Sequence, residues 1–155
     1  MANIAFFGLG AMGAPIANNL ASEGHHLAVF DTNPQACSRI SGPHVRIGNN
    51  PADTAQGCDF VITLLPTSSE VKQVICGPEG AIRASTKNTV FIDMSTGSLA
   101  DFMELHADIT AQEMSLIDSP IARGPEYAAA RQNLFLVGGE KSEIDRIYPI
   151  LAPIC

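Results

Sequence analysis

Ile4-Ala5-Phe6-Phe7-Gly8-Leu9-Gly10-Ala11-Met12-Gly13 is the most informative stretch of this 155-residue chain. Its first four residues predict a short buried strand, and residues 12–23 have the apolar spacing of a helix with one buried stripe. The glycine spacing alone is a weak signal. It gains weight because a second apolar run follows at 27–30 and ends in Asp31. Strand, glycine turn, helix, strand and acid is the order typical of a dinucleotide-binding unit.

Each glycine of this turn has its own physical task. Gly8 lets the chain turn tightly off the strand, Gly10 lets backbone approach a pyrophosphate, and Gly13 lets the helix pack closely on the sheet. The first amides of the helix lack partners within it, and they point at an anion together with the positive end of the helix dipole. A tight turn without any ligand is the alternative interpretation.

Asp31 bears on the choice between NAD and NADP. It stands about 20 residues past the first glycine, where a carboxylate accepts hydrogen bonds from the ribose hydroxyls of adenosine. The same charge would repel the 2′-phosphate of NADP, and Asn33 stands where an NADP site would more usefully offer arginine. The sequence therefore predicts NAD as the cofactor.

The composition limits the class of protein. Apolar residues make up 46% of the chain and charged residues 16%, which indicates one globular domain and excludes wholesale disorder. The net charge is −7 and the basic residues are scattered, so we expect no nucleic-acid partner. No apolar run reaches the ~20 residues that cross a bilayer, and no leader precedes the first strand, so we expect no membrane partner and a cytoplasmic location. The cysteines and histidines are dispersed, so we expect no metal site and no disulfide framework.

Apolar runs alternate with helical stretches along nearly the whole chain. This pattern predicts one α/β domain over residues 1–155, with a doubly wound, mainly parallel, Rossmann-type sheet and helices on both faces. Further strands are expected at residues 45–47, 60–65, 90–93, 116–117 and 134–137. The helix-capping residues are expected to be Asn33, Asn50, Ser68, Ser98 and Ser142.

The ligand of such a sheet lies at the carboxyl ends of its strands. The loops expected there are the glycine turn, residues 64–68, residues 94–98 and, as a further candidate, residues 121–124. Leu65 and Pro66 would form an apolar wall beside the adenosine or its ribose. Thr96 could hydrogen-bond near the nicotinamide ribose or amide, and a simple loop hydroxyl is an equally open interpretation of Thr96.

The opening stretch also closely resembles the start of the β-hydroxyacid dehydrogenase family, whose best-known members are 3-hydroxyisobutyrate dehydrogenase and tartronate semialdehyde reductase. The resemblance continues at residues 29–34, 64–66, 92–96, 118–121 and 136–139, so it covers essentially the whole chain. It implies that Ala11, Met12, Asp31, Leu65 and Thr96 touch NAD. With the glycine turn, the full set of expected cofactor-binding residues is Gly8, Leu9, Gly10, Ala11, Met12, Gly13, Asp31, Thr32, Asn33, Leu64, Leu65, Pro66 and Thr96.

The chain departs from the family pattern at Ala122-Arg123-Gly124. The family usually has Ser-Gly-Gly there, and the backbone of that segment holds the substrate carboxylate. An arginine at this point is similar to the branch that contains sulfolactaldehyde reductase and related semialdehyde reductases. Because a guanidinium can bind a carboxylate or sulfonate through two hydrogen bonds, we expect these three residues to hold the acidic end of a substrate. A solvated loop arginine is the alternative.

The resemblance also implies a second, helical half that this chain lacks. In the family that half carries the catalytic lysine in a Lys-x-x-Asn-Asn pattern, and none of Lys72, Lys87 and Lys141 is followed by such a pattern. We therefore expect no catalytic residue here, weak NAD binding and negligible turnover by the isolated chain. The complete enzyme would transfer hydride between NAD(H) and a small β-hydroxyacid or semialdehyde acid.

Three further expectations remain from the sequence. The apolar tail at 144–154 favours a homo-oligomer. A non-catalytic dinucleotide-binding module, with a redox-sensing or regulatory role, is an alternative function. A relative of 6-phosphogluconate dehydrogenase or of the imine reductases is another.

Overall fold

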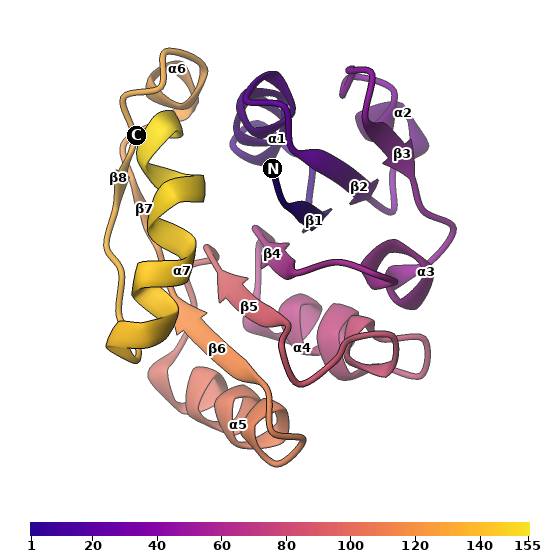
Figure 1. Ribbon diagram of the computed structural model, residues 1–155, viewed down its shortest axis with the longest axis vertical. Coiled ribbons are helices and arrows are strands. Elements are labelled where there is room, and N and C mark those ends of the chain that lie inside the picture. Colours follow the sequence, from indigo (N-terminus) through magenta and orange to yellow (C-terminus); the bar gives the residue numbers. More distant parts are fainter.

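The computed structural model describes all residues, 1–155, and arranges them around one six-stranded parallel sheet (Figure 1). In spatial order the strands are β3 (Val45–Ile47), β2 (His26–Phe30), β1 (Asn3–Phe7), β4 (Phe60–Thr63), β5 (Val90–Asp93) and β6 (Ser115–Asp118). All neighbouring pairs in this sheet run parallel. The strand order reverses at β1, which has β2 on one side and β4 on the other. The predicted doubly wound sheet is therefore confirmed.

Helices cover both faces of the sheet. They are α1 (Gly13–Ser22), α2 (Pro34–Cys37), α3 (Pro51–Ala55), α4 (Ser68–Cys76), α5 (Leu99–Thr110), α6 (Pro125–Ala129) and α7 (Lys141–Leu151). Short 3₁₀ turns lie at Ala81–Arg83 and Ala152–Ile154. The helices α1, α2, α6 and α7 contribute to the apolar layer on one face, while α3, α4 and α5 contribute to the layer on the other.

Strand β1 shows why the strands of this sheet have continuous apolar sequences. Ile4 and Phe6 pack into one apolar layer, and Ala5 and Phe7 pack into the other. All four side chains are fully buried. Because successive side chains of a strand point to opposite faces, a strand covered on both faces needs apolar residues at every position.

The helix starts follow the sequence signals with two exceptions. The side chains of Asn33, Asn50 and Ser98 cap α2, α3 and α5 as predicted. The prediction of Ser68 as the cap of α4 is wrong, because the Thr67 hydroxyl accepts the hydrogen bond from the Glu70 amide.

Ser142 was also predicted wrongly, as the cap of α7. That helix already begins at Lys141, and Glu140 precedes it without a side-chain cap. The first turn of α7 instead carries an ion pair between Lys141 and Asp145, whose Nζ and Oδ2 lie 2.7 Å apart. This exposed i, i+4 pair has its lysine on the N-terminal side, which is the weaker orientation, so it contributes little to the start of the helix.

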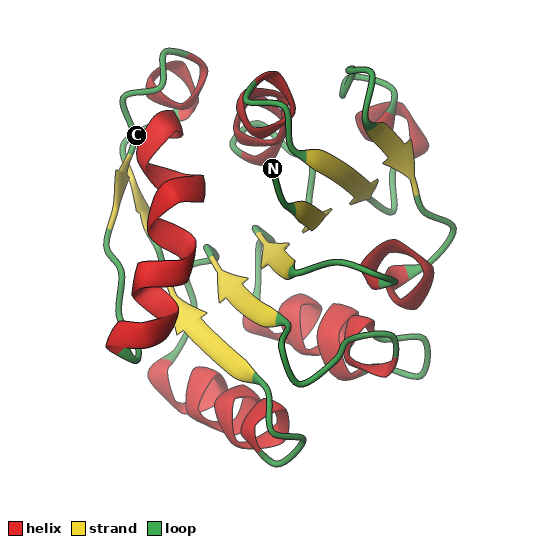
Figure 2. Cartoon of the chain, in the orientation of Figure 1, coloured by secondary structure: helices red, strands yellow, loops and turns green.

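The predicted strand at 134–137 does not join the parallel sheet. Only Leu134–Phe135 (β8) is a strand, and it pairs antiparallel with Ile121–Ala122 (β7), which the sequence reading missed. Figure 2 shows this two-stranded ribbon beside α7; it forms a sheet of its own, joined to the end of β6 by an antiparallel bridge between Gly138 and Asp118. The chain leaves β7, passes through α6 and returns alongside β7 in the opposite direction, so Leu134–Phe135 pairs antiparallel with Ile121–Ala122.

Candidate functional site

A cleft of about 520 Å³ opens at the carboxyl ends of β1, β2 and β4, where the strand order reverses. Three segments far apart in the sequence line it. The lining residues are Phe7, Gly8, Gly10, Ala11, Met12, Gly13, Phe30, Asp31, Thr32, Leu64, Leu65, Pro66, Glu70, Gln73 and Val74. The glycine turn and the loop after β4 therefore meet at one place, as expected for loops that leave parallel strands at the same edge.

The three glycines of the turn differ in what surrounds them. A Cβ on Gly8, which has a φ of +94°, would overlap the carbonyl oxygen of Leu64. A Cβ on Gly13 would overlap the carbonyl oxygen of Gly8, so helix and turn are in direct contact. A Cβ on Gly10 would meet no protein atom within 4 Å. The fold requires the first and third glycines, whereas Gly10 only keeps space free in the cleft.

Free hydrogen-bond donors stand beside that space. The backbone amides of Ala11, Met12 and Gly13 donate to no backbone acceptor, and the first amide of α1 with a partner is that of Ala14, 3.1 Å from the Gly10 carbonyl oxygen. No side chain caps this helix. Unpaired amides together with the positive end of a helix dipole attract an anion such as a pyrophosphate.

Asp31 connects two parts of the site. Its Oδ2 accepts a hydrogen bond from the Leu9 amide at 2.7 Å, and its Oδ1 accepts one from the Asn33 amide at 2.8 Å. A carboxylate has about four lone-pair positions, so capacity remains for ribose hydroxyls. The Leu9 side chain is fully buried in the core, and the Asn33 side chain caps α2, so neither side chain lines the cleft.

One wall of the cleft is apolar, and several lining residues were not predicted from the sequence. Leu64, Leu65 and Pro66 line the cleft as expected from their place after β4. The residues that sequence reasoning missed are Phe7, Phe30, Glu70, Gln73 and Val74. The last three belong to α4, and their i, i+3, i+4 spacing, which puts them on one helix face just after the predicted loop, was the available signal.

Two further groups of predicted residues lie outside this cleft. Thr96 is exposed in the loop after β5 and is not among the lining residues. Ala122-Arg123-Gly124 connects β7 to α6, and Arg123 has a φ of +80°. The Nη1 of Arg123 donates to the Gln132 carbonyl oxygen at 2.9 Å, and its guanidinium carbon lies 5.3 Å from the centre of the Tyr127 ring. The guanidinium has no carboxylate partner in the structure.

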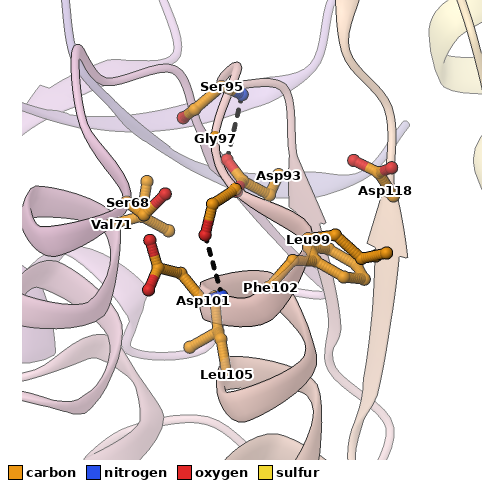
Figure 3. A pocket seen from close by; sticks show the side chains of 11 residues that line it. Ser68, Val71, Asp93, Ser95, Gly97, Leu99, Asp101, Phe102, Leu105 and Asp118 are labelled. Atoms are coloured by element: carbon orange, nitrogen blue, oxygen red, sulfur yellow. Dashed lines mark hydrogen bonds between the residues drawn. The ribbon is translucent and has the colours of Figure 1, made fainter.

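A smaller cavity of about 160 Å³ lies at the ends of β5 and β6 (Figure 3). Asp93 and Asp118 stand at paired positions of these strands and both line it. Burial raises the pKa of the Asp93 carboxyl, although hydrogen bonds from Ser95 and Thr63 oppose the shift. Burial and the charge of Asp93 raise the pKa of Asp118. No group of three or more acidic, histidine or cysteine side chains is arranged to hold a metal ion.

None of the seven α-helices combines the length and the apolar character that a membrane span requires.

The family model for the NAD-binding domain of 6-phosphogluconate dehydrogenase matches residues 3–155. The 3-sulfolactaldehyde reductase of Escherichia coli K12 is 38% identical over 151 residues, which are 97% of this chain and 51% of that protein. The mitochondrial 3-hydroxyisobutyrate dehydrogenase of Homo sapiens is 33% identical over 140 residues, or 90% of this chain and 42% of that protein.

A solved structure agrees with these sequence matches. The structure of the 3-hydroxyisobutyrate dehydrogenase of Mycobacterium tuberculosis with L-serine superimposes with a TM-score of 0.92 at 37% identity. The match covers 100% of this chain and 52% of that structure. The chain thus spans about half the length of the relatives that it matches.

Proposed function

The chain belongs to the family of the NAD-binding domain of 6-phosphogluconate dehydrogenase, and from that premise we propose that its 520 Å³ cleft is where the cofactor binds. The observation that carries this proposal is the surroundings of Gly10. Its missing side chain leaves open space, and the unpaired amides of Ala11 and Met12 border that space. An anionic pyrophosphate fits such a place because it supplies the acceptors that these donors lack.

The adenosine half of the cofactor would occupy the remainder of the cleft. Asp31 would accept hydrogen bonds from its ribose hydroxyls, while Leu65 and Val74 would pack against the base. The charge of Asp31 supports a preference for NAD over NADP, and no lysine or arginine lines the cleft to hold a 2′-phosphate. Arg39 donates to the Leu9 carbonyl oxygen at 3.2 Å and is not a lining residue.

For the complete enzyme, we propose hydride transfer with a small β-hydroxyacid or semialdehyde acid, of which a sulfolactaldehyde-like compound is one example. A bound nicotinamide would supply or accept the hydride, and this domain would orient it. Thr96 would contact the nicotinamide side, and Arg123 would bind the acidic end of the substrate. The absence of a carboxylate partner for Arg123 supports that role, because most of its donors stay available for an anion.

The lysines of this chain are poor candidates for a general acid. Lys72, Lys87 and Lys141 each pair with a surface carboxylate, and none lines the cleft. These contacts support the proposal that residues 1–155 alone bind cofactor without turning over substrate. A missing general acid typically costs ~10²–10⁴ in rate, and losing the groups that position the substrate costs more.

We also propose that the protein resides in a reducing compartment such as the cytoplasm, because its four cysteines are free.

We further propose that the chain self-associates. An apolar groove of about 290 Å³ lies between β8 and α7, lined by Phe135, Val137, Ile144, Ile147, Tyr148, Leu151, Ala152 and Cys155. Tyr148 is 69% exposed there, as is typical of a surface that another polypeptide covers. Sedimentation analysis of the purified chain at several concentrations tests this, and a monomer throughout would contradict it.

Calorimetric titration with NADH and NADPH tests the cofactor proposal. We expect saturable binding of NADH and binding of NADPH that is at least about tenfold weaker, a difference of ~1.4 kcal/mol. Equal affinities would contradict the role given to Asp31. The absence of saturable heat with either cofactor would contradict the proposed site as a whole.

A further inference from the structure

The wall of the cleft is held from behind by a buried series of hydrogen bonds. The Leu65 amide donates to the Ser95 Oγ at 3.0 Å, and the Ser95 amide donates to the Asp93 Oδ1 at 3.0 Å. The same Asp93 oxygen accepts from the Thr63 Oγ1 at 2.9 Å. Thr63 is the last residue of β4 and Leu65 lies in the loop after it, while Asp93 is the last residue of β5 and Ser95 lies in the loop after that strand. The series therefore joins the ends of two neighbouring strands in a closed circuit.

These polar groups lie where apolar residues would be expected. Thr63 is fully buried, and only 5% of Ser95 and 9% of Asp93 are exposed. A buried polar group costs free energy unless it is hydrogen-bonded, and apolar side chains of similar size would often be at least as stabilising. The strands themselves do not need the series, because Met94 already donates a backbone bond to Thr63 at 2.8 Å. What the series adds is a defined position for Leu65.

The position of this loop matters for the glycine turn as well. The Leu64 amide donates to the Phe7 carbonyl oxygen at 2.9 Å, and the Leu64 carbonyl oxygen occupies the place that a Gly8 Cβ would need. A shift of the loop would therefore press on the turn that borders the pyrophosphate space. Ser95 lines the small cavity at the ends of β5 and β6 (Figure 3) and is not among the residues that line the cleft.

We propose that Ser95 is a positioning residue for cofactor binding. Its hydroxyl, set in place by Asp93, holds the Leu65 amide so that the wall at 64–66 stands where the adenosine half of NAD packs. The residue acts through Leu65 and does not touch the cofactor. This inference rests on the cofactor site proposed above.

The test compares Ser95→Ala with Ser98→Ala in residues 1–155. Both changes remove a hydroxyl that lines the same small cavity, but the Ser98 hydroxyl caps α5 by accepting from the Asp101 amide at 3.1 Å. Because Leu65 loses the acceptor that holds its amide, we expect Ser95→Ala to weaken binding of NADH and of ADP-ribose by about fivefold. Ser98→Ala should lower the melting temperature and leave both affinities unchanged. Ser95→Thr, which keeps the hydroxyl, should restore binding.

Hydrogen exchange gives a second readout, and its measurement on the original chain does not require any variant to fold. The Leu65 amide of the unliganded protein should exchange slowly, and in Ser95→Ala it should exchange at least about tenfold faster while the amides of β1 stay protected. The inference is overturned if folded Ser95→Ala binds NADH as tightly as the original chain, or if the Leu65 amide of the original chain exchanges freely. If the original chain itself does not bind NADH, the proposed function fails instead, and the exchange result still decides whether Ser95 holds Leu65.

Discussion

The Asp31 carboxylate accepts a hydrogen bond from the Leu9 amide at 2.7 Å, so the acid at the end of β2 is fastened to the turn that leaves β1. The two residues lie 22 positions apart in the sequence. Their contact places the carboxylate proposed to bind the ribose beside the amides proposed to face the pyrophosphate. The spacing between glycines and acid in the sequence reflects this contact.

Replacing Asp31 by Asn should weaken NADH binding by about tenfold and narrow the preference for NADH over NADPH. The change removes the negative charge that repels a 2′-phosphate and one acceptor from the ribose hydroxyls, and a charge-assisted hydrogen bond contributes ~1.5–3 kcal/mol. Calorimetric titration of both cofactors measures the effect. Asp59→Asn is the matched control, because the Asp59 Oδ2 also accepts from a backbone amide, that of Asn3 at 2.9 Å, outside the cleft. An unchanged NADH-to-NADPH ratio in Asp31→Asn would contradict the assignment.

Gly10→Ala and Gly13→Ala should separate binding from folding. The first places a methyl group in open space, so unfolding free energy should change by less than about 0.5 kcal/mol while NADH affinity falls at least tenfold. The second forces a methyl group against the Gly8 carbonyl oxygen and should destabilise the chain by ~1–3 kcal/mol or more. Urea unfolding and NADH titration of both variants check this. Normal NADH binding by Gly10→Ala would show that the pyrophosphate lies elsewhere.

Asp93→Asn should alter how stability depends on pH. Burial raises the pKa of Asp93 in the folded state above its ordinary value, so protonation of this carboxyl favours the folded state. This contribution is fully present below the unfolded pKa and is lost as pH rises through the folded pKa. Because Asn stays neutral and keeps an acceptor oxygen for Thr63 and Ser95, the variant should gain stability relative to the original chain as pH rises. Urea unfolding of both proteins at a series of pH values measures this difference, and a difference that is constant with pH would refute the expectation.

Arg123→Ala in the complete enzyme should raise the Michaelis constant for an acidic substrate by about tenfold or more, with a smaller effect on the maximal rate. Arg123→Lys should recover only part of the loss, because lysine keeps the charge without the two-pronged geometry. Arg146→Ala is a suitable control, since Arg146 also donates to a backbone carbonyl, that of Asn88, and stacks on a ring, that of Phe60. If the Michaelis constant barely moves in Arg123→Ala, the arginine is a solvated loop residue.

Residues 1–155 alone should bind NADH without oxidising any β-hydroxyacid at a measurable steady rate. None of the lysines lies in the cleft to serve as a general acid. Incubating the purified chain with NAD and a panel of small β-hydroxyacids, and following NADH absorbance, tests this expectation. Addition of the half of a relative that this chain does not match is an informative control. Steady turnover by the chain alone would contradict the proposal that residues 1–155 bind the cofactor without turning over substrate.

Sequence patterns located nearly every element of the main sheet. Asn33 and Asn50, each followed by proline, marked two helix starts because cap and first turn are adjacent in the chain. The same logic failed at Ser142, where a plausible cap stands inside α7. Local patterns identify residues able to cap a helix, but neighbouring packing selects the one that does.

Some residues of the candidate site were likewise predicted from the sequence, and others were not. Gly8, Asp31 and Leu65 were expected in the cleft and line it. Glu70 and Gln73 were not expected, because their approach depends on the direction in which α4 leaves Pro66. Thr96 and Arg123 remain predictions, since they lie outside the cleft in the structure.

The amino-acid sequence on its own determined the order of strands and helices and the position of the glycine turn. Those features arise from apolar runs, caps and glycines that act on residues close along the chain. The tertiary structure alone decided that β8 turns away from the sheet, that one face of α4 closes the cleft, and that the Leu65 amide meets Ser95. These relationships join segments separated by many residues, and they exist only once both faces of the sheet are packed.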